Sequence, residues 1–361
     1  MSIESLARPE IVAMTPYSSA RKEAPGEGVL LNANESPWSL IEPAGAQRGL
    51  NRYPDPQPAE LVTALANLYE VDEQNILVTR GSDEGIDLLT RVFCRAGQDA
   101  VLQCPPTFGM YQIAAQTQGA HIVSVPRSDT NGFKLDRQAV LDALDRDDRI
   151  KLIYLTSPNN PTGDLVEEDF LKDLLNACRE RALVVVDEAY SEFCAAPSAT
   201  GLISRYENLV VLRTLSKAWG AAGLRCGVVL AQPPVISLLG RVIAPYPLPS
   251  PVISLALRML APDMMKRQHG LLGRIRDNKQ ALLAALRNYS FITDILPGEA
   301  NFVLIKMDPA AELVDFCAKR NVILRAFPGN PVLQDWISIS VGSEEEIRAL
   351  TGVLDAWERQ S

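Results

Sequence analysis

Short apolar runs alternate with helix-like patterns along residues 31–240, and this alternation restricts the possible folds more than any other feature of the chain. Uninterrupted apolar runs are typical of parallel strands that are buried on both faces. Strands that alternate with helices indicate βαβ units. The sequence therefore predicts an α/β fold with a mostly parallel central sheet. Strands are expected at residues 76–79, 100–103, 121–125, 151–156, 182–187, 208–213 and 226–230, and helices at 58–69, 84–95, 108–118, 137–145 and 167–180.

The remaining part of the chain has a different pattern. Four prolines alternate over residues 245–251, and a regular helix does not run through such a segment. A long helix is expected at 252–289, followed by a smaller α+β unit with strands at 301–306, 321–325 and 336–341. We therefore divide the chain into an amino-terminal arm (1–30), a large domain (31–245), and an inter-domain helix with a small carboxy-terminal domain (246–361).

Polar residues follow directly after two of the apolar runs. Asp187 comes after the run 182–186, and Asn160 lies in Ser157-Pro-Asn-Asn-Pro-Thr-Gly163 after the run 151–156. Ligands of open α/β sheets bind outside the carboxyl ends of the strands, so both side chains are candidates for a binding site. Taken alone, Asp187 also fits a helix N-cap, and Asn160 fits an ordinary turn.

Lys217 lies in Thr214-Leu-Ser-Lys-Ala-Trp-Gly-Ala-Ala-Gly-Leu-Arg225, among small and apolar residues. Lysine forms Schiff bases with carbonyl compounds, and its pKa falls readily on burial, whereas arginine stays charged. Ser216 and Arg225 supply a hydroxyl and a guanidinium, which are both phosphate-binding groups. A single lysine is most often solvated at a surface, so the case for Lys217 depends on these neighbours.

A second candidate for phosphate binding lies upstream. The segment Gly81-Ser-Asp-Glu-Gly85 follows the apolar residues 76–79 and precedes the helical pattern 86–93. A strand, a tight turn and a helix start in this order present backbone amides to an anion. Ser82 and Asp83 are therefore candidates, although an ordinary turn with an acidic helix start has the same pattern.

Together these residues meet the requirements of pyridoxal 5'-phosphate. The cofactor's aldehyde reacts with a lysine, and its ring nitrogen stays protonated beside a carboxylate such as Asp187. Asn160 and Tyr190 are suitable hydrogen-bond donors for its phenolic oxygen. Each signal is weak alone, but their order and spacing along the chain predict a site for this cofactor.

At these residues the chain resembles the fold-type I, aspartate-aminotransferase-like enzymes, and more closely the histidinol-phosphate aminotransferase family. The resemblance runs from about residue 11 to the end of the chain. Besides the cofactor motifs, it rests on Thr15-Pro-Tyr-Ser-Ser-Ala-Arg21, Leu31-Asn-Ala-Asn-Glu35, Asn51-Arg-Tyr-Pro-Asp55, Arg80-Gly-Ser-Asp-Glu-Gly85, Cys104-Pro-Pro-Thr-Phe-Gly-Met-Tyr111 and Arg241-Val-Ile-Ala-Pro-Tyr-Pro247.

The resemblance implies a role for each cofactor-site residue. Lys217 would bond the cofactor and move the substrate proton, Asp187 would pair with the ring nitrogen, and Asn160 and Tyr190 would bond the phenolic oxygen. Phe108 would stack on the ring. The phosphate would be held by Ser216, Arg225 and the backbone amides near Ser82 and Asp83.

The resemblance also implies a homodimer with shared active sites, because Tyr53 matches a tyrosine that reaches the cofactor phosphate of the neighbouring subunit. Tyr17, Asn34 and Arg325 would bind the substrate. The implied reaction transfers an amino group between the pair glutamate/2-oxoglutarate and the pair imidazole acetol phosphate/histidinol phosphate, in histidine biosynthesis.

One residue departs from the family pattern. Ser338, in Trp336-Ile-Ser-Ile-Ser-Val-Gly342, stands where the family usually has an arginine that binds an acidic group of the substrate. Serine brings no charge and forms no bidentate pair with a carboxylate or phosphate. Three explanations stay open: another cation, weak acid binding, or a different substrate. An aromatic amino-acid aminotransferase and a pyridoxal-phosphate-dependent decarboxylase therefore remain alternatives.

The bulk composition restricts partners and location. With 35 basic and 44 acidic residues the net charge is −9, which argues against a nucleic-acid partner. Only two histidines occur and no Cys-x-x-Cys pair is present, so we expect no metal site and reduced thiols. No apolar stretch reaches the ~18 residues of a membrane span, and no signal peptide is recognisable. The expected location is the cytoplasm.

Overall fold

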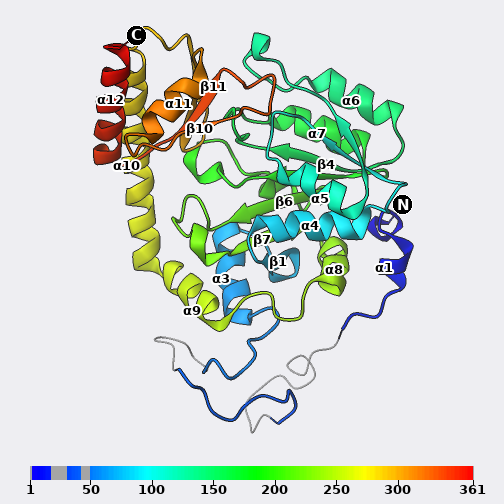
Figure 1. Cartoon of the computed structure of the whole chain (residues 1–361). Helices are drawn as coiled ribbons and strands as arrows, with labels where there is room; N and C mark the ends of the chain where they lie inside the picture. Colours follow the sequence, from blue (N-terminus) through cyan, green and yellow to red (C-terminus); the bar gives the residue numbers. More distant parts are fainter. Residues whose placement is uncertain (1, 18–30, 42–48, 361) are drawn as a thin grey trace.

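The computed structural model describes residues 2–17, 31–41 and 49–360. Two sheets with their helices form two units, and α10 runs along the side that links them (Figure 1). Parts of the amino-terminal arm expected at residues 1–30 lie outside the described residues.

The larger sheet has seven strands in the order β1-β7-β6-β5-β4-β2-β3. Neighbours from β6 to β3 pair in parallel, and β7 is antiparallel to both β6 and β1. The expected mostly parallel central sheet is therefore confirmed. The strands are β1 (Ile76–Thr79), β2 (Ala100–Gln103), β3 (His121–Ser124), β4 (Ile150–Thr156), β5 (Leu183–Asp187), β6 (Leu209–Thr214) and β7 (Gly227–Ala231).

Helices cover both faces of this sheet because successive strand residues point to opposite sides. In β5, Val184 and Val186 belong to one apolar core, whereas Leu183 and Val185 belong to the other. The first core contains residues of α3 (Ala59–Tyr69), α6 (Arg137–Arg146), α7 (Glu168–Ala177) and α9 (Ser250–Met259). The second contains residues of α4 (Ser82–Phe93), α5 (Met110–Gln118) and α8 (Pro233–Val242), beside α1 (Pro9–Ala13).

The smaller sheet is antiparallel, in the order β10-β11-β9-β8. Its apolar core includes Leu282 of α10, Leu313 of α11 and Leu354 of α12. The elements are α10 (Pro262–Leu286), β8 (Asp294–Leu296), β9 (Phe302–Lys306), α11 (Ala310–Ala318), β10 (Arg325–Ala326), β11 (Trp336–Ser340) and α12 (Glu344–Glu358).

Two of the sequence-based expectations need correction here. The long helix expected at 252–289 is two helices, because Pro262 begins α10 and has no N–H with which to continue α9. The strand expected at 321–325 is reduced to the two residues of β10 at the sheet edge. Strand β8, with its exposed and half-buried residues, carries no apolar run and was not expected.

The two units touch through backbone at a pair of glycines. A Cβ on Gly298 would lie 2.7 Å from the Cα of Gly163, and both residues have positive φ. The amide of Glu299 donates to the carbonyl of Gly163 at 2.7 Å. Gly163 closes the loop that carries Asn160, so this contact joins the small unit to a candidate site residue.

We predict that Gly298→Ala destabilises the protein by about 2 kcal/mol or more, because a Cβ clashes with Gly163 and φ is +52°. Urea unfolding measures this loss. Gly352→Ala in α12 is the matched control, since a Cβ there meets no atom within 4 Å. It should be neutral or stabilising by about 1 kcal/mol. Equal effects of the two substitutions would contradict the glycine contact.

Candidate active site

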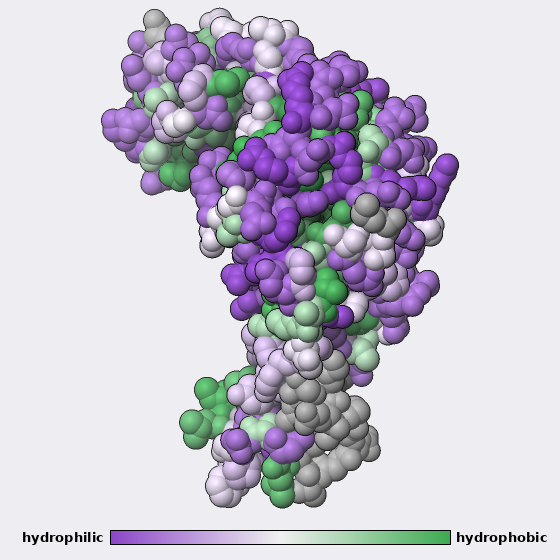
Figure 2. Space-filling model, turned by 90° about the vertical axis from the view of Figure 1, so that its right-hand side faces the viewer, coloured by the Kyte–Doolittle hydropathy of each residue, from purple (hydrophilic) through white to green (hydrophobic). Residues whose placement is uncertain are grey.

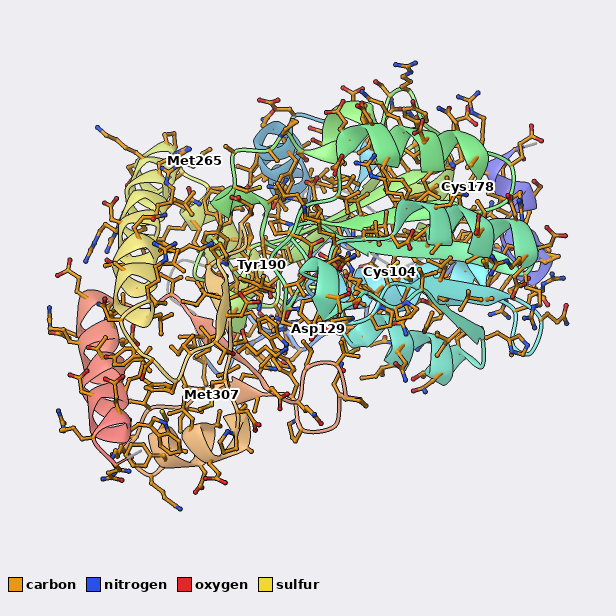
Figure 3. The ribbon with its side chains drawn as sticks, turned by 90° about the horizontal axis from the view of Figure 1, so that it is seen from above. Cys104, Asp129, Cys178, Tyr190, Met265 and Met307 are labelled. Carbon is orange, nitrogen blue, oxygen red and sulfur yellow. The ribbon has the colours of Figure 1, made fainter. Side chains whose placement is uncertain are left out.

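A cavity of about 750 Å³ lies where the larger sheet meets the smaller one. Its lining includes residues that follow β4, β5 and β6, the start of α4, and part of β10 and β11. Seen from above, Tyr190 lies between α10 and the large sheet (Figure 3). The candidates that line this cavity are Ser82, Asp83, Phe108, Asn160, Asp187, Tyr190, Ser216, Lys217, Arg225 and Arg325.

Asp187 ends β5 and is only 2% exposed. It accepts hydrogen bonds from two neutral donors, the hydroxyl of Tyr111 at 2.8 Å and the amide of Ala189 at 3.1 Å. Burial raises the pKa of Asp187 to about 6, although the Tyr111 bond opposes this rise. A buried carboxylate with neutral partners is well suited to a cationic ring nitrogen in the cavity.

Asn160 and Tyr190 are joined by a hydrogen bond. The amide nitrogen of Asn160 donates to the Tyr190 hydroxyl at 3.1 Å. Burial raises the pKa of Tyr190 to about 12, so the phenol stays neutral and keeps its proton for donation. The expected pair of neutral donors is therefore assembled at the cavity wall.

Lys217 follows β6 in a turn and lines the same cavity. Its ammonium lies 5.5 Å from the centre of the Tyr190 ring. The sequence separates Lys217 from Asn160 by more than fifty residues, and the ends of β6 and β4, which lie on either side of β5, bring the two side chains to one site.

The cavity lining also includes anion-binding groups. Arg225 donates to Asp83 at 2.9 Å and to Ser216 at 3.4 Å, beside the start of α4. The N-cap of α4, Gly81, makes no side-chain cap, so amides of the first turn are available to an anion. Gly81 has a φ of +80°, a backbone conformation that residues with a side chain rarely adopt, so this turn favours glycine.

Phe108 lines the cavity, and it packs against a buried tyrosine, Tyr111, that was not among the sequence-based candidates. This contact is edge-on, with the ring centres 5.7 Å apart. Tyr111, fully buried and stacked on Tyr154 at 4.6 Å, holds Asp187 in place. Its only signal in the sequence was its position at the end of Cys104-Pro-Pro-Thr-Phe-Gly-Met-Tyr111.

Arg325 and Ser338 stand directly opposite one another in the β10–β11 pair, and both line the cavity. Among the described lining residues, the basic side chains are Lys217, Arg225 and Arg325. Among these described lining residues, no further cation replaces the arginine that the family usually has at the position of Ser338. Arg325 is therefore the cation that the small unit presents to the cavity.

The structure does not bring Tyr17, Asn34 or Tyr53 to this cavity of the single chain. Tyr17 is 70% exposed. Tyr53 is 47% exposed and stacks on Tyr246 with the ring centres 4.5 Å apart. The segments 31–41 and 49–57, which contain Asn34 and Tyr53, project below the large sheet (Figure 1).

The described residues contain no cluster of three or more potential metal ligands. Within the same residues, no helix is sufficiently long and apolar to cross a bilayer. All six cysteines are free thiols.

Comparison with known proteins identifies the family. The model of the family described as aminotransferase class I and II matches residues 18–354. The chain belongs to this family. It is 44% identical over 355 residues to histidinol-phosphate aminotransferase from Aeromonas hydrophila, covering 98% of each chain. It is 40% identical to the protein of that name from Escherichia coli, covering 99% of this chain and 98% of the other.

A solved structure supports the same assignment as an aminotransferase. Histidinol-phosphate aminotransferase from Sinorhizobium meliloti, in complex with pyridoxal-5'-phosphate, superposes with a TM-score of 0.77. It is 26% identical, and the match covers 86% of this chain and 83% of that one. The fold-type I architecture expected from the sequence is confirmed.

We predict a pH-dependent cost of burying Asp187 in protein free of cofactor. Because its pKa is raised from 3.8 to about 6, the folded state binds more protons than the unfolded state between these values. The stability contributed by Asp187 is therefore present below about pH 4 and lost as pH rises through about 6, by about 3 kcal/mol.

Urea unfolding of wild type and Asp187→Asn from pH 4 to 7 measures this difference. Asp147→Asn is the control, because hydrogen bonds from Arg149 lower the pKa of Asp147 from 3.8, so its contribution changes only below about pH 4 and should stay constant over this range. A constant difference between wild type and Asp187→Asn over this range would rule out the raised pKa.

Proposed function

We propose that this chain binds pyridoxal 5'-phosphate in the cavity described above and uses it to transfer amino groups. The observation that carries the proposal is the meeting of Asp187, Lys217 and the Asn160–Tyr190 pair at one cavity. Asp187 would face the ring nitrogen, and Arg225, Ser216 and the first turn of α4 would hold the phosphate. Phe108 would stack on the ring.

When bound, the cofactor supplies an aldehyde that takes up the amino group and a ring that stores the released electron pair. Asp187 keeps a proton on the ring nitrogen, and Asn160 and Tyr190 donate to the phenolic oxygen. Lys217 holds the cofactor until substrate arrives, and its free amine then moves the proton at the substrate's α-carbon.

We propose glutamate as amino donor and imidazole acetol phosphate as acceptor, which yields 2-oxoglutarate and histidinol phosphate in histidine biosynthesis. The names of the relatives that match nearly the whole chain at 40–44% identity support this substrate pair. Arg325, opposite Ser338, would bind the acidic group of the substrate. An aromatic amino-acid aminotransferase or a decarboxylase of the same fold are the alternatives that Ser338 leaves open.

A half-reaction tests the substrate. We expect protein loaded with pyridoxal phosphate to convert to the pyridoxamine form when histidinol phosphate is added without keto acid, as followed by absorbance. Lys217→Ala should lose turnover by at least about a thousandfold, because Lys217 supplies the side-chain amine among the described residues that line the site. It should still retain some cofactor through Arg225 and Asp187.

Conversion by phenylalanine but not by histidinol phosphate would move the substrate to an aromatic amino acid. Release of carbon dioxide without 2-oxoglutarate would indicate a decarboxylase. Full activity of Lys217→Ala would contradict the assigned site.

We further propose a homodimer with shared active sites. Tyr53 lies away from its own cavity, and the segment 31–41 exposes large apolar side chains on the projecting part of the molecule (Figure 2). The most exposed of these are Leu31, Trp38, Leu40 and Ile41. A second copy of the chain would cover this surface and place Tyr53 at its neighbour's cofactor phosphate.

We also propose a cytoplasmic location, with which the free thiols of the chain agree.

Mixing two inactive variants tests the sharing. If Lys217→Ala and Tyr53→Ala are unfolded and refolded together, half of the dimers combine the two chains, and each of these contains one complete site. Recovery of about a quarter of the wild-type activity is expected for a two-fold dimer. Recovery of none, with mixed dimers demonstrated by differently tagged chains, would show that each chain builds its site alone.

A further inference from the structure

Arg213 lies outside the cavity and forms a buried ion-pair network behind it. It is 8% exposed and belongs to β6, four residues before Lys217. One guanidinium nitrogen donates to Glu188 at 2.8 Å, and the other donates to Glu192 at 2.9 Å. The guanidinium also packs over the Tyr69 ring at 4.8 Å.

The two glutamates that bind Arg213 flank Tyr190 in the sequence, two residues before it and two residues after it. Glu188 follows Asp187 directly, and Glu192 lies in the short helical turn η4 (Ser191–Phe193) that begins after Tyr190. The carbonyl of Glu188 accepts from the amide of Ser191 at 3.2 Å and closes the turn. Arg213 therefore bridges both ends of the segment that presents the Tyr190 hydroxyl to Asn160.

The charges of this network also affect the cavity residue Asp187. Burial lowers the pKa of Arg213, but Glu192, Tyr69 and Glu188 together raise it above its ordinary value, so the guanidinium stays charged. It is one cation between two carboxylates, of which Glu188 is buried and Glu192 is partly buried. The negative charge of Glu188 raises the pKa of Asp187, although less than burial does, and Arg213 offsets that charge.

We propose that Arg213 is a positioning residue for the reaction, which acts by holding Tyr190 against the phenolic oxygen of the bound cofactor. Its fork geometry is essential, because a lysine ammonium is a point charge and does not reach both carboxylates at once. This inference rests on the proposed cofactor binding. It predicts that loosening the bridge weakens the Tyr190 hydrogen bond and raises the pH at which the bound cofactor's absorbance changes.

The test is a pH titration of the absorbance of the full chain loaded with pyridoxal phosphate. Arg213→Lys keeps the charge and removes the bridge, so its midpoint should rise by about one pH unit through loss of one hydrogen bond. The midpoint of Arg213→Met should rise at least as far, provided that this variant folds. Arg95→Lys changes an ion pair with Asp99 that lies outside the cavity lining, and should titrate as wild type.

A double-mutant cycle separates positioning from general damage. In a Tyr190→Phe background the hydroxyl is already absent, so Arg213→Lys should add no further shift. Unchanged midpoints in the single variants, or a full additional shift beside Tyr190→Phe, would overturn the role of Arg213. Failure of the wild type to take up the cofactor would instead refute the proposed function, so the two failures are distinguishable.

Discussion

The site depends on a buried carboxylate whose hydrogen-bond donors, within the described part of the chain, are neutral. Asp187 ends a fully buried strand, and its two hydrogen bonds come from the Tyr111 hydroxyl and the Ala189 amide. This arrangement is unfavourable for an ionised group alone, and it becomes favourable when a cationic ring nitrogen enters the cavity. The cationic ring of the proposed cofactor would therefore balance the buried negative charge of Asp187.

The sheet order explains why the remaining groups meet Asp187. Strands β4, β5 and β6 are parallel neighbours, so the segments that follow them emerge at the same edge. Asn160, Tyr190 and Lys217 come from these three segments. Strand β7 returns antiparallel to β6 and pairs with β1, which places Arg225 beside the first turn of α4. One topology therefore assembles both the ring-binding and the phosphate-binding ends.

The sequence predicted this part of the molecule well because buried strands and strand-end polar residues leave local signals. Other features leave none. Tyr111 looks like an ordinary helix residue until the fold brings it to Asp187, and Arg213 looks like a strand residue until Glu188 and Glu192 approach it. Pro262 divides the helix expected at 252–289, although the Leu- and Ala-rich pattern continues on both sides of it. The roles expected for Tyr17, Asn34 and Tyr53 stay predictions, since they concern a second chain or a bound substrate.

The most direct test of this account is the protonation state of the ring nitrogen of bound pyridoxal phosphate, measured by ¹⁵N NMR with the nitrogen-labelled cofactor. If Asp187 is its partner, the nitrogen carries a proton from about pH 7 to 9 in the wild type and loses it in Asp187→Asn. An unprotonated nitrogen in the wild-type protein at pH 7 would contradict the central role given to Asp187.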